Sequence, residues 1–247
     1  MQRYFVKPHQ LLDNRITITG DDVHHIVKVM RGKPGDQLIV CDSEGRCARA
    51  RLVDLGTQEV QAEIVEMLDE QRELPIHVTI AQGLPKSDKL EWIVQKGTEL
   101  GMTTLVPFSS ERTIVKLDPK KEAKKRERWQ KIAKEAAEQA HRTRVPEVMP
   151  AVGFAELLEQ ANRYTSCVIA YEQENTTSLQ TVLASLRQGD SLCVLIGPEG
   201  GFTTEEVAQA EQAGIVPVSL GPRILRTETA SQYVLAAVSY HFESPNR

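Results

Sequence analysis

Two glycine-containing segments near the end of the chain have residue types that can surround a ligand. Residues 197–201, Gly-Pro-Glu-Gly-Gly, directly follow the apolar run 192–196, and residues 219–230 follow the apolar run 215–218. Each apolar run is short and rich in branched side chains, which predicts a buried strand of a parallel sheet. Ligands bind beyond the carboxyl ends of such strands, so the two segments predict one binding site.

The order of the glycines excludes two common nucleotide-binding turns. The first segment lacks the lysine and the spacing of a P-loop, and its glycines do not lead straight into a helix as in a dinucleotide fold. Glycine instead lets the backbone approach a flat ligand closely, while Pro198 and Pro222 stiffen the two turns. The alternative for either turn alone is an ordinary connection between a strand and a helix.

Charged residues in and near the turns are the candidates for catalysis. Glu199 lies within the first turn, Arg226 and Glu228 follow the second, and Arg112 leaves an earlier predicted strand at the same edge of the sheet. An arginine can stabilise a developing anion, and a carboxylate can accept a proton or orient a base. Among the arginines, Arg226 is the preferred candidate for stabilising an anion, followed by Arg112 and then Arg142.

Strands and helices alternate beyond residue 75, which is typical of an α/β layer fold with a largely parallel sheet. The predicted strands are 76–81, 105–108, 166–170, 192–196 and 215–219; the predicted helices are 86–100, 119–139, 154–160, 178–186, 204–213 and 227–242. We expect Ser87 to cap the first of these helices, and Thr203 or Thr204 to cap the helix after the first glycine turn.

The first 70 residues predict a separate small β-barrel. Short alternating runs at 15–19, 37–41, 47–54 and 59–66 predict strands, and one helix is expected from residue 21 or 22 to about 30. Residues 71–75, charged and closed by a proline, predict a linker, so the expected domains are 1–70 and 76–247. Adjacent His24 and His25 cannot share a helix face, which favours packing or RNA contact over metal binding or catalysis.

Positive charge is concentrated in one region although the net charge is −4. Residues 116–144 hold eleven Lys or Arg against five Asp or Glu. A basic helix attracts phosphates, although the same pattern also fits a solvated helix with ion pairs. Arg142 and Arg144 at its end can bind phosphate or base oxygens, or Arg142 can cap the helix. Arg3 and Arg31 belong to a basic set that can form one face of the barrel.

Several classes of protein are excluded by composition. No apolar run approaches the eighteen or so residues that span a membrane, and the first residues lack the hydrophobic segment of a signal peptide. The cysteines at 41, 47, 167 and 193 have no metal-binding spacing and are expected to be reduced core residues. The sequence therefore predicts a cytoplasmic protein without a metal.

The two glycine turns together resemble the RsmE family of the SPOUT class of methyltransferases. Residues 195–201 and the run 220–230, Leu-Gly-Pro-Arg-Ile-Leu-Arg-Thr-Glu-Thr-Ala, carry the likeness, which extends over nearly the whole chain. Glu138, Gln139 and Arg142 match a Glu-Gln-x-x-Arg signature of the family, whereas Ala140 stands where many members have serine. Members of this family methylate N3 of a uridine in the 16S ribosomal RNA of the small ribosomal subunit.

The resemblance implies a fold, a cofactor and a set of site residues. The fold is a C-terminal trefoil-knot domain with a mostly parallel sheet and an N-terminal PUA-like barrel; the protein is a homodimer that binds S-adenosylmethionine (SAM). Methyl transfer from a sulfonium needs alignment and no metal. The expected catalytic residues are Arg226, Arg112, Glu199 and Glu228, and the expected RNA contacts are Arg3, Arg31, Arg142 and Arg144. The expected SAM-binding residues are Ala170, Tyr171, Glu172, Leu195, Ile196, Gly197, Pro198, Glu199, Gly200, Gly201, Ser219, Leu220, Gly221, Arg223, Ile224, Leu225 and Thr229.

Three alternatives remain at this point. The chain can be a SPOUT enzyme that methylates a ribose 2′-hydroxyl, or an RNA-binding protein that kept the fold without activity. It can also be an enzyme that uses the glycine turns for nucleotide phosphates, although the missing P-loop lysine argues against this.

Overall fold

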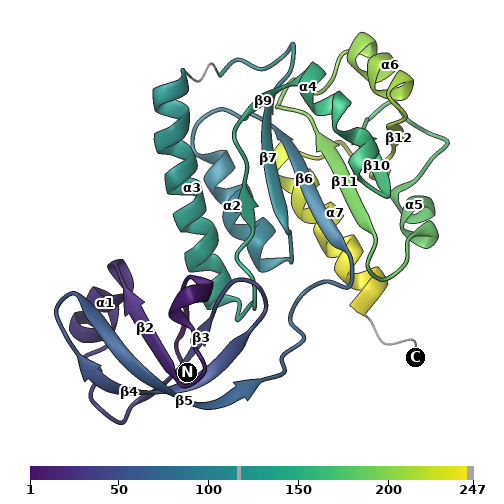
Figure 1. Ribbon diagram of the computed structural model, residues 1–247. Coiled ribbons are helices and arrows are strands. Elements are labelled where there is room, and N and C mark those ends of the chain that lie inside the picture. The colour runs from purple at the N-terminus through teal and green to yellow at the C-terminus, as the bar shows by residue number, and fades with distance from the viewer. Residues whose placement is uncertain (116–117, 244–247) are drawn as a thin grey trace. The chain divides into compact units, whose positions relative to one another are not determined.

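The computed structural model describes residues 1–115 and 118–243, which divide into two compact units (Figure 1). The first unit contains Met1–Glu73 and Ala137–Val145, and the second contains Leu74–Ala136 and the described residues from Pro146 onward. The chain passes from one unit to the other within the predicted linker 71–75. Residues 137–145 return to the first unit, which the sequence did not predict because no local pattern reports a contact so far along the chain.

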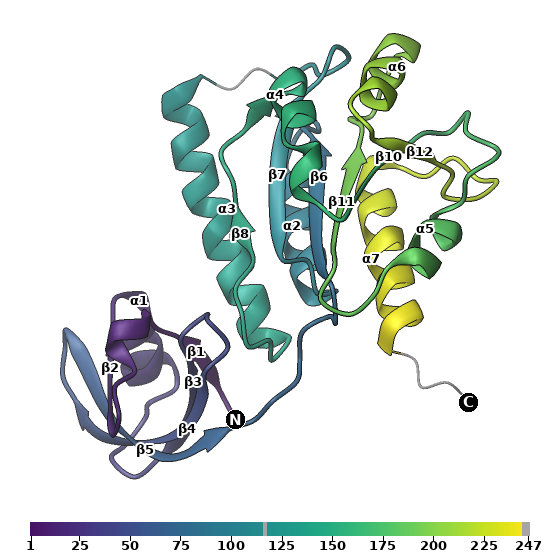
Figure 2. The same cartoon turned by 45° about the vertical axis from the view of Figure 1, so that its right-hand side comes forward.

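A curved five-stranded sheet forms most of the first unit, in the order β1-β3-β4-β5-β2. β1 pairs with β3 in parallel, and the other neighbours are antiparallel. Figure 2 shows how strongly this sheet bends around α1. The elements are β1 (Arg3–Phe5), η1 (Pro8–Gln10), β2 (Arg15–Thr19), α1 (Asp21–His24), η2 (His25–Val29), β3 (Gln37–Cys41), β4 (Cys47–Leu55) and β5 (Glu59–Leu68).

The concave face of this sheet is apolar because every second residue of each strand is apolar. Ile16 and Ile18 of β2 lie opposite Ala62 and Val60 of β5, and all four are buried. Ile26, from η2, completes the same core. The alternation that predicted these strands therefore sets which face is buried. β1 was not predicted, because three residues are too few to show a period of two.

Two of the four cysteines form a disulfide, so the expectation of four reduced thiols is wrong for this pair. Cys41 ends β3, Cys47 begins β4, and the two lie opposite each other across the hairpin. Sequence spacing alone did not reveal this pairing, which depends on strand register. Cys167 and Cys193 are free and buried, as expected.

A parallel sheet forms the centre of the second unit, in the order β12-β10-β11-β6-β7-β8, with β9 beside β7. Every pairing in it is parallel, so the predicted α/β class is confirmed. The strands are β6 (His77–Gly83), β7 (Thr104–Ser109), β8 (Glu147–Val148), β9 (Val152–Gly153), β10 (Ser166–Ala170), β11 (Ser191–Ile196) and β12 (Val216–Val218). The helices are α2 (Lys89–Glu99), α3 (Pro119–Gln139), α4 (Phe154–Glu159), η3 (Ala161–Arg163), α5 (Leu179–Ser185), α6 (Thr204–Gln212) and α7 (Thr227–Glu243).

Helices cover both faces of this sheet, as a buried parallel sheet requires. α2 and α7 pack against each other, and α7 contacts β6 and β11 from one side (Figures 1 and 2). On the other side, Phe154 of α4 packs with Phe108 of β7 and Phe202, with ring centroids 6.0 and 5.9 Å from Phe154. Phe202 directly follows the first glycine turn, so this cluster anchors the turn in the core.

Of the two predicted helix caps, the structure shows one and not the other. The Thr203 side chain accepts a hydrogen bond from the Glu206 backbone N–H, which confirms its predicted capping role, and Ser178 caps α5 in the same way. Ser87 does not cap α2: its φ of 57° is left-handed, and the helix begins two residues later, at Lys89. A left-handed residue cannot hold the extended backbone that an N-cap needs.

Candidate functional site

One pocket of about 680 Å³ lies at the carboxyl edge of the parallel sheet of the second unit. Its volume is in the range of sites for small organic ligands. Because β10, β11 and β12 are parallel, the loops that follow them leave the sheet at this edge. The lining residues are Lys89, Ala170, Tyr171, Glu172, Asn175, Ile196, Gly197, Pro198, Glu199, Gly200, Gly201, Phe202, Ser219, Leu220, Gly221, Pro222, Arg223, Ile224, Leu225, Arg226, Thr227 and Ala230.

Backbone conformation favours glycine within the first turn, and close packing requires glycine where β6 meets that turn. Gly201 has a φ of 66°, which favours glycine over residues with a side chain. At the end of β6, a Cβ atom on Gly83 would lie 2.5 Å from the backbone N of Pro198. The turn after β11 is therefore pressed against the end of β6, and only glycine fits at this contact.

A buried hydrogen-bonded chain ties the first turn to the start of α7. The Thr227 hydroxyl donates to the carbonyl of Gly197 at 2.6 Å and accepts from Gln82 Nε2 at 2.7 Å. Gln82 is fully buried in β6, and Thr227 is nearly so. Three segments that are far apart in the sequence thus converge beneath the pocket, in the region where the resemblance implies a knot.

An ion cluster stands beside this chain. Lys89 Nζ lies 3.1 Å from Glu199 Oε1 and 3.3 Å from Glu228 Oε2. Burial pushes the pKa of Glu199 upward, but hydrogen bonds from its own backbone N–H, from Lys89 and from the backbone of Lys86 leave that pKa below its usual value. The hydrogen bond with Glu199 is the main cause of a raised pKa of Lys89.

The two predicted catalytic arginines occupy different positions. Arg226 is exposed and lines the pocket. Arg112 lies outside the lining, and its Nη1 donates to the carbonyl of Gly200 at 2.7 Å. It therefore supports the first turn from the outer side, and its guanidinium group is held there by the backbone.

Most of the residues expected to bind SAM line this one pocket, with two exceptions. Leu195 is fully buried in β11, where it belongs to the core cluster that contains Ile169 and Phe202. Thr229 is exposed on α7 and does not line the pocket. Glu228, expected to be catalytic, contacts the pocket only through the Lys89 cluster.

Sequence reasoning missed several lining residues. Phe202 and Thr227 directly follow residues that were predicted, so extending each turn by one residue would have included them. Lys89, at the start of α2, was not among the expected site residues. Asn175 lies five residues beyond β10 and carries no recognisable local signal.

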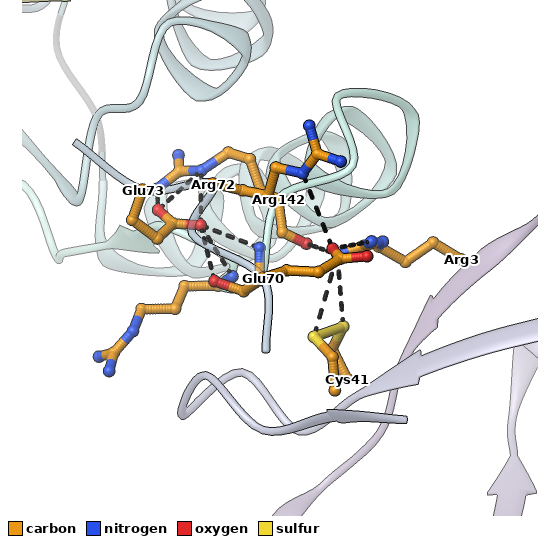
Figure 3. A network of polar contacts seen from close by, with 9 residues as sticks. Arg3, Cys41, Glu70, Arg72, Glu73 and Arg142 are labelled. Carbon is orange, nitrogen blue, oxygen red and sulfur yellow. Dashed lines mark hydrogen bonds and ion pairs between the residues drawn. A yellow bond between two sulfur atoms is a disulfide. The ribbon is translucent and has the colours of Figure 1, made fainter. Parts of the chain in front are cut away.

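The structure corrects two of the four expected RNA contacts. Arg3 and Arg142 are both buried, and each is paired with a carboxylate of the first unit (Figure 3). Arg3 Nη2 donates to Glu70 at 2.5 Å, and its Nη1 donates to the Arg142 carbonyl at 2.8 Å and to the sulfurs of Cys41 and Cys47. We interpret these arginines as structural, because both side chains are buried and ion-paired inside the fold.

The Arg142 side chain is bound by Glu73, which also accepts hydrogen bonds from the backbone N–H groups of Thr143 and Arg144. One carboxylate thus fixes the segment that follows α3 (Figure 3). Arg31 and Arg144 are exposed, and the Arg144 guanidinium group lies over Gly45 of the β3–β4 hairpin. These two remain candidate RNA contacts.

In the part of the chain that the structure describes, no group of three or more His, Cys, Asp or Glu side chains could hold a metal ion. His25 Nδ1 lies 2.9 Å from the Tyr4 hydroxyl, within the packing of the first unit. Among the described helices, none is long and apolar enough to cross a membrane.

Comparison with known proteins agrees with both units. The model of an RNA methyltransferase domain matches residues 72–239, and that of an RNA methyltransferase PUA domain matches residues 18–65. The chain is 49% identical to the ribosomal RNA small subunit methyltransferase E of Bacillus subtilis over 98% of both chains. It is 37% identical to the enzyme of the same name from Synechocystis, covering 98% of this chain and 78% of that one.

One similar protein of known structure was solved with a bound ligand. The crystal structure of a ribosomal RNA small subunit methyltransferase E from Neisseria gonorrhoeae bound to S-adenosyl methionine superposes with a TM-score of 0.86, at 33% identity over 97% of each chain. The predicted combination of a parallel-sheet domain and a PUA-like barrel is therefore confirmed. The chain belongs to the family of ribosomal RNA small subunit methyltransferases E, the RsmE family that its two glycine turns resemble.

Proposed function

We propose that this protein transfers the methyl group of SAM to N3 of a uridine in 16S ribosomal RNA of the small subunit. The observation that carries the proposal is the single pocket formed by both glycine turns. Two further facts support it: the chain is 49% identical to a small-subunit rRNA methyltransferase, and a relative of the same fold binds SAM.

The residues of the pocket fit the parts of SAM. Ile196, Leu220 and Leu225 supply apolar surface for adenine, and the exposed backbone of the glycine turns supplies hydrogen-bonding groups. Bound SAM supplies an electrophilic methyl group on a sulfonium that leaves as a neutral thioether. This chain then has to align the uracil N3 with that carbon and accommodate the proton that N3 loses.

The Arg226 side chain is placed to favour the uracil anion. Arg226 is exposed and lines the pocket, so that the oxygens of a bound uracil can reach its side chain. Positive charge aimed at developing negative charge lowers the barrier most when it is fixed before the reaction. Arg112 contributes indirectly, because it holds the Gly200 carbonyl.

Binding of RNA requires cations outside the pocket. Lys120, Lys124 and Lys125 are exposed on α3, and Arg31 and Arg144 are exposed in the first unit. Phosphates of the RNA are the acceptors that such residues attract, with an affinity that falls as salt rises. A base that is paired at N3 must first be exposed before it can react.

A homodimer and a cytoplasmic location complete the proposal. Tyr233 and Tyr240 on α7 are 41% and 77% exposed, and large aromatic side chains are enriched in protein interfaces. We assign this face of α7 to the contact between two copies.

The test is methyl transfer from labelled SAM to small ribosomal subunits that lack the modification, followed by nucleoside digestion and mass spectrometry. Labelled 3-methyluridine is the expected product. A 2′-O-methylated nucleoside would replace the proposed reaction with ribose methylation. Binding of SAM without transfer to subunits or to free 16S RNA would overturn the substrate, and failure to bind SAM would leave a non-enzymatic RNA-binding protein.

A further inference from the structure

Lys89 joins three chain segments at the edge of the pocket. It is the first residue of α2, and it lines the pocket. Its ammonium group lies 3.1 Å from Glu199 of the first glycine turn and 3.3 Å from Glu228 in the first turn of α7. Both carboxylates belong to segments that form the pocket wall, and Glu228 follows Arg226 by two residues.

The two carboxylates depend on this ammonium to different degrees. Glu199 also accepts a hydrogen bond from the Lys86 backbone N–H, at 3.1 Å. Glu228 Oε2 is buried and accepts no hydrogen bond from the described residues, so Lys89 Nζ at ion-pair distance compensates its charge. Without Lys89, two carboxylates would face each other with no cation between them, and like charges held close together repel.

A side chain that contacts both Glu199 and Glu228 must carry a positive charge and more than one hydrogen-bond donor. A lysine ammonium has three donors on a flexible stem, so it can serve both carboxylates at once. The charged side chain in contact with Glu199 is Lys89 of α2. Glu228 of α7 meets the same ammonium group, and Arg226 and Glu172 line the same pocket. Lys89 is the one that contacts both carboxylates.

We propose that Lys89 is a positioning residue of the methyl-transfer site, which clamps the first glycine turn to the start of α7 through Glu199 and Glu228. The clamp adds to the Thr227–Gly197 hydrogen bond and fixes the segment that carries Arg226 relative to the first glycine turn. Lys89 therefore acts on the reaction through these two carboxylates, and it does not itself contact the reacting atoms. The inference rests on the proposed methyl-transfer function.

The test compares Lys89→Met with Lys89→Arg, and uses Lys96→Met as the matched control. Lys96 lies on the same helix and pairs with Glu99, away from the pocket lining. With saturating SAM, Lys89→Met should lower kcat by roughly 10- to 100-fold, the effect of small misplacement in a site that depends on alignment. Lys89→Arg should restore most of the rate, and Lys96→Met should leave it unchanged.

The pH dependence separates positioning from a general loss of stability. In the native protein Lys89 helps to hold the pKa of Glu199 below its usual value, so that carboxylate stays ionised down to acidic pH. In Lys89→Met the burial that raises this pKa acts without the opposing ammonium. The acidic limb of the pH–rate profile should therefore move to higher pH in Lys89→Met, and return in Lys89→Arg.

A second measurement keeps the test independent of activity. Carbon-13 NMR titration of Glu199, assigned with Glu199→Gln, should show a lower pKa in the native protein than in Lys89→Met. Equal titration and an unchanged kcat in Lys89→Met would overturn the clamp. An inactive native protein would instead remove the proposed function, and the titration alone would then decide whether Lys89 controls Glu199.

Discussion

Two arginines near the pocket, Arg226 and Arg112, differ in their contacts. Arg226 lines the pocket, whereas Arg112 lies outside the lining and donates to the backbone of the first turn. This difference separates two residues that the sequence placed in the same class. The consequence is a different kinetic signature for each substitution.

Arg226→Ala should reduce kcat by about 100-fold or more, while the Kd of SAM changes by less than about threefold. A preorganised donor that acts on transition-state charge has an effect of this size on kcat. Calorimetric titration with SAM and single-turnover methyl transfer provide the two numbers. Arg187→Ala, which removes an exposed arginine outside the pocket lining, serves as the control. An unchanged turnover in Arg226→Ala would remove its role.

Thr227→Val should weaken SAM binding and lower the free energy of unfolding by about 1–3 kcal/mol, because two buried partners lose their hydrogen bonds. The Gly197 carbonyl and Gln82 Nε2 are those partners. Urea denaturation and SAM titration measure the two effects. Thr227→Ser keeps the hydroxyl and should behave as the native protein; an equally damaged Ser variant would attribute the effect to the lost methyl group.

Elements carry the next level of organisation, and α3 is the most highly charged of them. Its buried face contains Trp129 and Ala133, and its exposed face contains Lys120 and Lys124, one helical turn apart. The observed bounds of α3 equal the predicted 119–139.

Replacing both Lys120 and Lys124 with glutamate should weaken RNA binding without changing SAM affinity. The slope of log affinity against log salt should decrease in magnitude by about 1 for each lost cation that contacted a phosphate. Filter binding of 16S RNA fragments across a salt series measures it. Arg187→Glu, exposed before β11, is the control. An unaltered salt slope would mean that α3 is only a solvated helix.

The β3–β4 hairpin makes a prediction about redox state. Its disulfide spans six residues, so the loop-entropy model gives a stabilisation of about 2 kcal/mol. Treatment with a thiol reductant should lower the free energy of unfolding by that amount in urea denaturation. A variant with alanine at both positions 41 and 47 should not respond to reductant, and a response in that variant would locate the effect elsewhere.

At the scale of the whole molecule, the two units should respond differently to SAM. The pocket belongs entirely to the second unit. SAM at 100 times its Kd stabilises the state that binds it by about 2.7 kcal/mol, which corresponds to a rise in Tm of roughly 5–10 °C. Calorimetry should show this shift in the transition that contains the second unit.

Adenosine triphosphate is the control for that measurement, because it shares adenosine with SAM but carries phosphates that no P-loop here would bind. A comparable shift with the triphosphate would favour the nucleotide-binding alternative. No shift with SAM would remove the proposed cofactor.

The sequence by itself determined the longer strands, most helices and the location of the ligand site, but not the short strands β1, β8 and β9. These features follow from periodicity and from glycine and proline placement, which act over a few residues. Residues 15–19 and 37–41 form strands with the predicted bounds, and both glycine turns line one pocket.

Only the tertiary structure decided which charged residues face the pocket and which are buried in ion pairs inside the fold. Arg3 and Arg142 looked like surface cations, but Glu70 and Glu73 bind them, and the Cys41–Cys47 pair depends on the register of a hairpin. Lys89 contacts carboxylates that lie more than a hundred residues away in the sequence. Burial and charge pairing depend on contacts between residues that are far apart in the sequence, and no local sequence pattern predicts such contacts.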